Sequence, residues 1–128
     1  MANVMRLELY RPISYVRDDA LDPFNVAASA VASAEGELLF CFQAEPLELQ
    51  CAGFELYDGE IHEEVALPAG RYCFAQEREL LARRAIADMA AEIRRFAAGD
   101  GCELENKLYL RYLFEDGKIV TQLFHPHR

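Results

Sequence analysis

Apolar and charged side chains alternate over residues 4–10, and this period of two predicts a half-buried β-strand. Pro12 interrupts the strand, which resumes over residues 13–16, so a bulge or a sheet edge is expected there. Gly53 is expected to mark another bulge, and the Asp-Gly dipeptide at residues 58–59 predicts a tight hairpin. Further strands are predicted at residues 37–43, 47–57, 61–67, 71–74, 107–114 and 119–124.

A helical period predicts two helices between these strands. Asp22 can cap the first helix and Pro23 suits its first turn, while Gly36 ends it near Glu35. The second helix has one apolar stripe and ends at the glycines of residues 99–101. The stripe is formed by Leu81, Ala85, Ile86, Met89, Ile93, Phe96 and Ala97.

The order strand, helix, strand, strand occurs twice, over residues 5–57 and 61–124. Each pass begins with a strand broken near a proline, Pro12 in the first and Pro68 in the second. The doubled pattern predicts a single α+β domain over residues 1–128, built from two strand-helix-strand-strand repeats with a shared cleft between the halves.

Composition narrows the range of functions. Apolar residues make up 52% of the chain and charged residues 27%, which is typical of a globular domain. The formal charge of −9 argues against nucleic acid or an anionic membrane as the partner and leaves a basic protein open. The longest apolar stretch, residues 26–34, is too short to span a bilayer, and the N-terminus has no targeting pattern, so we expect a cytoplasmic protein.

The cysteines and histidines show no spacing typical of a metal site or a redox motif, so we expect no metal, no cofactor and no disulfide framework. The four cysteines are Cys41, Cys51, Cys73 and Cys102, three of them inside predicted strands. His62 is expected in a solvated turn, and residues 125–128 are expected to fray. No catalytic motif for hydrolysis, nucleotide binding or zinc chemistry is present.

The segment Leu67-Pro68-Ala69-Gly70-Arg71-Tyr72 is similar to the "(I/L)PAG-x-Y" motif of the gyrase-inhibitor-like (GyrI-like) small-molecule-binding domain. Residues 7–17, 108–113 and 121–126 resemble other strands of that family. The resemblance implies two helices on one face of a curved antiparallel sheet, with an open aromatic cleft on the other face. It also implies lipophilic, often cationic ligands, although Gln122 stands where the family often has a charge-pairing Glu.

Alternation within residues 107–114 separates two faces of a strand. We expect the more apolar face to cover a helix, and this face is formed by Leu108, Leu110, Tyr112 and Phe114. This leaves Tyr109 and Arg111 for either the cleft or a solvated surface. Glu55 is either a replacement for the acid missing at position 122 or a surface charge. Tyr15 and Tyr72 occupy matching places in the repeats and are either cleft or core residues. The candidate ligand-binding residues are Tyr15, Glu55, Tyr57, Tyr72, Tyr109, Arg111 and Gln122.

These observations favour a non-catalytic domain that binds a small, partly apolar molecule. One alternative is an acidic protein-interaction module, acting as an inhibitor or adaptor of a basic partner. Another is a small hydrolase or isomerase that uses cleft Tyr and Glu side chains, although no catalytic residue is assigned.

Overall fold

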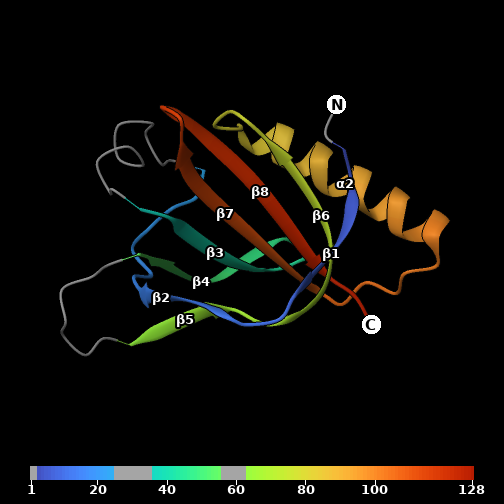
Figure 1. Cartoon of the computed structure of the whole chain (residues 1–128), viewed down its shortest axis with the longest axis horizontal. Helices are drawn as coiled ribbons and strands as arrows, with labels where there is room; N and C mark the ends of the chain where they lie inside the picture. The colour runs from blue at the N-terminus through green and yellow to red at the C-terminus, as the bar shows by residue number, and fades with distance from the viewer. Residues whose placement is uncertain (1–2, 25–35, 56–62) are drawn as a thin grey trace.

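The computed structural model describes residues 3–24, 36–55 and 63–128 of the chain. In this part of the chain an eight-stranded antiparallel sheet is accompanied by one long helix, α2 (Arg83–Asp100) (Figure 1). The strands are β1 (Met5–Leu9), β2 (Ile13–Arg17), β3 (Leu38–Gln43), β4 (Glu48–Phe54), β5 (Glu64–Leu67), β6 (Gly70–Glu77), β7 (Lys107–Glu115) and β8 (Lys118–Pro126). The predicted α+β class is confirmed.

The sheet curls because each edge strand is joined along the chain to the strand next to the opposite edge. The strand order is β1-β6-β8-β7-β3-β4-β2-β5. β1 leads into β2 past Pro12, and β5 leads into β6 past Pro68. β1 pairs with β6 and β2 pairs with β5, so these two broken strands lie side by side (Figure 1). The predicted curved antiparallel sheet is therefore confirmed.

Helix α2 covers one face of the sheet, where it packs on β6 and β8. Its buried stripe includes Ile86, Met89, Ile93 and Ala97, as the helical period predicts. These side chains share a core with alternate strand residues such as Leu110. The face turned away from α2, here called the inner face, carries a second buried cluster that contains no helix residue. No helix within the described ranges combines the length and the apolar character needed to cross a bilayer.

The first predicted helix is described only at its start. Asp22 Oδ1 accepts a hydrogen bond from the Phe24 N–H at 3.0 Å, which is the geometry expected of an N-cap. Residues 25–35 lie outside the described residues, so the expected second helix on the sheet stays a prediction.

The hairpins at β3–β4 and β7–β8 form between neighbouring strands, as predicted. The hairpin expected around residues 58–59 would pair β4 with β5, and this pairing is wrong. Residues 58–59 themselves lie outside the described ranges. β4 and β5 are not neighbours, because β2 lies between them and pairs with both. The Asp-Gly signal did not indicate that β2 would lie between β4 and β5.

Gly53 does not form the predicted bulge. The register shift in the β3–β4 pair lies between Cys41 and Phe42 instead. A Cβ atom at Gly53 would come within 2.4 Å of Val65 Cγ2 and 2.8 Å of the Val16 carbonyl oxygen. Glycine is required here because β4 and its neighbours approach too closely for any side chain.

The C-terminus is ordered, so the prediction that residues 125–128 fray is wrong. His125 belongs to β8 and is only 3% exposed. The His127 N–H donates to the Arg71 carbonyl at 3.0 Å, and the Arg128 N–H donates to the Glu103 carbonyl at 2.9 Å. Backbone hydrogen bonds to two separate segments hold the end of the chain in place.

Candidate functional site

Two rows of side chains cross β6, β8 and β7 on the inner face, because the strand register places residues that point to the same face directly opposite one another. The first, here called the aromatic row, consists of Phe74, Phe124 and Tyr109. The second, here called the polar row, lies two residues away on each strand and consists of Gln76, Gln122 and Arg111. A continuous apolar strip therefore borders a strip of hydrogen-bonding groups.

The aromatic row is closely packed. The Phe74 and Phe124 rings lie 4.9 Å apart between centroids, and Tyr72 meets Phe124 edge to face at 5.7 Å. Tyr72 also meets Tyr109 edge to face at 6.2 Å, and its hydroxyl donates to the Pro68 carbonyl at 2.5 Å. These geometries are the favoured ones for aromatic pairs. The rings bury one another, and Tyr109 is 8% exposed.

The polar row continues into an ion pair with a residue that precedes β3. Arg111 donates from Nε to Glu37 Oε2 at 3.0 Å and from Nη2 to Glu37 Oε1 at 2.5 Å. The Tyr15 hydroxyl donates to Glu37 Oε2 at 2.6 Å and accepts from Arg111 Nε at 2.9 Å. On its other side Arg111 Nη1 donates to Gln122 Oε1 at 3.3 Å. Gln122 Nε2 in turn donates to Gln76 Oε1 at 2.9 Å, which completes a chain of polar contacts.

The phenols on this face resist ionisation. Burial raises the pKa of Tyr15 above its usual value, and the bond to Glu37 raises it further. Burial also raises the pKa of Tyr109 to about 12. The Tyr109 hydroxyl has no hydrogen-bond partner among the described residues, so it is a neutral donor and acceptor next to an apolar surface.

Three of the predicted site residues come together in these rows. Tyr109 and Arg111 lie on the inner face, and Gln122 lies directly opposite Arg111 in the β7–β8 register. The prediction that Leu108 faces the helix is also confirmed, but Phe114, assigned to the same face, is 49% exposed.

The other predicted residues lie around the same face. Tyr15 and Tyr72 both belong to the buried inner cluster, so each is a core aromatic there. Glu55 is half-buried, and its Oε2 accepts from the Glu37 N–H at 3.3 Å. Tyr57 lies outside the described residues.

Sequence reasoning missed Glu37 and Gln76. Glu37 has the same parity as Leu39 and Cys41, which lie in the inner cluster, so alternation alone could have placed it on this face. The pairing itself could not be read from the sequence, since Glu37 and Arg111 lie on different strands far apart along the chain.

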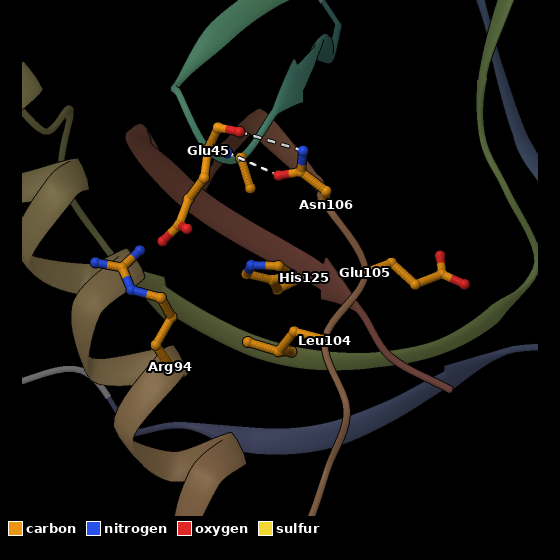
Figure 2. Close-up of a pocket in the computed structure, with 7 residues that line it drawn as sticks. Glu45, Arg94, Leu104, Glu105, Asn106 and His125 are labelled. Carbon is orange, nitrogen blue, oxygen red and sulfur yellow. Dashed lines mark hydrogen bonds between the residues drawn. The ribbon is translucent and has the colours of Figure 1, made fainter.

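A separate pocket of about 330 Å³ opens on the helix side of the sheet. It is lined by Ala44, Glu45, Arg94, Leu104, Glu105, Asn106 and His125. Figure 2 shows the His125 imidazole between Leu104 and the hydrogen-bonded pair of Glu45 and Asn106, with Arg94 across from it on α2.

His125 is the notable group in this pocket. Its Nδ1 is buried without a hydrogen-bond partner among the described residues. Burial lowers the pKa of His125, and the positive charge of Arg94 lowers it further. An imidazole whose charged form is disfavoured by burial therefore lines this pocket.

No protein-family model matches the chain, and no curated protein matches it. Among solved structures, the chain is similar to SAV2435, which was solved bound to tetraphenylphosphonium. The TM-score is 0.51 at 10% sequence identity, and the match covers 100% of this chain and 94% of that one. This likeness shows a shared fold.

Proposed function

We propose that the chain is a non-catalytic domain that binds a small, partly apolar molecule on the inner face. The apolar part of the ligand lies against the aromatic row, and its polar part reaches the polar row. The observation that carries the proposal is the adjacency of these two rows, together with the unpartnered hydroxyl that Tyr109 contributes to the aromatic row. The shared fold with SAV2435, itself solved with an organic cation, supports the same class of function.

The proposal includes two pseudo-symmetric halves, residues 5–57 and 61–124, as in the GyrI-like domain. The strand order supports this. If β1 is exchanged with β5, β2 with β6, β3 with β7 and β4 with β8, the strand order across the sheet is the same read from the other edge. The face between the halves is then formed by strands from both, with Tyr15 and Glu55 from the first half and Tyr72, Tyr109, Arg111 and Gln122 from the second.

The charge arrangement on the inner face informs the choice of ligand. Both oxygens of Glu37 are engaged by Arg111 and Tyr15, so this carboxylate is already neutralised. Gln122 carries no charge and bonds to Gln76. We therefore propose recognition by apolar contact and hydrogen bonding rather than by a charge pair, so binding changes little with salt.

A thermal-shift assay with three ligands of related shape tests this. Tetraphenylphosphonium is a cation, tetraphenylborate is an anion of the same shape, and triphenylphosphine oxide is a neutral acceptor. A ligand at about 100 times its dissociation constant adds about 2.7 kcal/mol to the free energy of unfolding, which raises the melting temperature by several degrees. We expect a shift with triphenylphosphine oxide that persists at high salt.

Matched variants locate the binding site. Tyr109→Phe and Gln122→Leu remove polar groups from the inner face, whereas His125→Gln changes the helix-side pocket. The ligand-induced shift should decrease in the first two variants and persist in the third. A shift lost only in His125→Gln would place the ligand in the other pocket, and the absence of any shift across the three compounds would contradict the proposal.

A further inference from the structure

Three metal-binding side chains that lie far apart in the sequence meet where the end of α2 and the C-terminus approach β6. The ligand atoms of Cys73, Cys102 and His127 all lie within 4.8 Å of one another. We propose that these three residues form a binding site for Zn²⁺. The site is distinct from the inner face, because Cys73 and Cys102 pack with the helix-side core.

The backbone positions of all three residues are fixed. Cys73 lies within β6, paired with β1 on one side and β8 on the other. Cys102 follows the left-handed Gly101 at the end of α2, and its N–H donates to the Ala97 carbonyl at 2.9 Å. His127 pairs with Leu104 in an isolated bridge. Folding without metal therefore brings the ligands together, which lowers the cost of binding.

The donor set suits zinc. Two thiolates and an imidazole are soft-to-borderline ligands, and catalytic zinc sites often use three protein ligands with an open fourth position. The bond lengths of tetrahedral zinc place sulfur and nitrogen ligands about 3.6–3.8 Å apart. The observed cluster therefore needs only small side-chain movements to close around the ion. Each thiol releases its proton to solvent, so the bound site is electrically neutral.

The hydrogen bond of His127 prepares it for this role. Its Nδ1 lies 2.9 Å from the Arg128 carbonyl oxygen, which can only accept, so Nδ1 carries the proton and Nε2 is left as the metal ligand. A hollow of about 310 Å³ lies beside His127, between Arg6 and Arg71. Water or a small ligand from this hollow can fill the fourth position on the metal.

Titration of the full chain with Co²⁺ under reducing conditions tests the site, since a cobalt ion bound by thiolates has a characteristic charge-transfer absorption. We expect one Co²⁺ per chain, displaced by Zn²⁺. Cys102→Ser and His127→Gln should each weaken binding at least tenfold, since even the loss of an outer-shell partner of a metal ligand costs about 10- to 100-fold. Both side chains are half-buried, so neither substitution opens the core.

Cys51→Ser is the matched control, because Cys51 is also a half-buried thiol but lies on β4, opposite Cys41. Its cobalt affinity should equal that of the unsubstituted protein. The proposal is overturned if the folded, reduced chain gives no charge-transfer band. It is equally overturned if the band survives in both Cys102→Ser and His127→Gln, or if Cys51→Ser alone removes it.

Discussion

The Arg111 guanidinium holds both carboxylate oxygens of Glu37, at 3.0 and 2.5 Å, and so ties β7 to the residue before β3. The β3–β7 register places Arg111 opposite Leu39, which makes the ion pair a diagonal contact on the inner face. Because the two side chains are only 15% and 26% exposed, each depends on the other for its charge to be compensated.

Glu37→Gln should therefore destabilise the chain by about 1–3 kcal/mol, since it leaves the Arg111 charge half-buried and unpaired. Arg111→Met in the same background should recover part of this loss, because the uncompensated charge is then gone. Urea unfolding of the two single variants and the double variant measures the coupling. Strictly additive effects would show that the pair contributes nothing as a unit.

Gly53→Ala should destabilise the chain by about 3 kcal/mol, because the new Cβ would collide with Val65 and with the Val16 carbonyl. Gly99→Ala is the control, since it lies within α2 and a Cβ there meets nothing within 4 Å. That substitution should stabilise the chain by about 0.5 kcal/mol through a better helix propensity. Denaturant midpoints measure both, and equal effects at the two glycines would contradict the packing at Gly53.

Two tyrosines on β7 provide a second matched pair. The Tyr112 hydroxyl donates to the Pro23 carbonyl at 3.0 Å in the helix-side core, whereas the Tyr109 hydroxyl has no partner among the described residues. Tyr112→Phe should lower the free energy of unfolding by about 1 kcal/mol, and Tyr109→Phe should change it by less than about 0.5 kcal/mol. Thermal melts compare the two, and the reverse order would mean that the hydroxyl environments are wrongly assigned.

Alkaline pH should weaken the fold through Tyr109. Its pKa is raised to about 12 in the folded state, compared with about 10 in an unfolded chain. The stabilisation is therefore complete below pH 10 and is lost as the pH rises toward 12, by at most about 2–3 kcal/mol. Unfolding of the unsubstituted protein and of Tyr109→Phe across this range isolates the effect. Parallel curves for the two proteins would contradict it.

Local patterns in the sequence predicted local structure well. Alternation along β7 correctly placed Leu108 and Leu110 toward α2 and Tyr109 away from it, because the period of a strand is fixed by backbone geometry. The stripe that includes Ile86 and Ile93 likewise identified the buried side of α2. Phe114 is exposed rather than covered, because it lies near the turn at the end of β7.

Long-range partners could not be predicted. The signal at residues 58–59 predicted that β4 would pair with β5, but β2 lies between them and pairs with both. The contact of Arg111 with Glu37 and the meeting of Cys73 with Cys102 depend on strand order and on where α2 ends. The sequence contains the residue types for both sites, whereas only the topology brings them within reach of each other.

The most direct test of the proposed function is a calorimetric titration of triphenylphosphine oxide into the unsubstituted chain, Tyr109→Phe and Tyr112→Phe. The two variants each lose one hydroxyl from β7, on opposite faces of the sheet. Binding on the inner face predicts a dissociation constant about 3- to 10-fold weaker for Tyr109→Phe and unchanged for Tyr112→Phe. Equal affinity in all three proteins, or no binding to the unsubstituted chain, would contradict an inner-face ligand site.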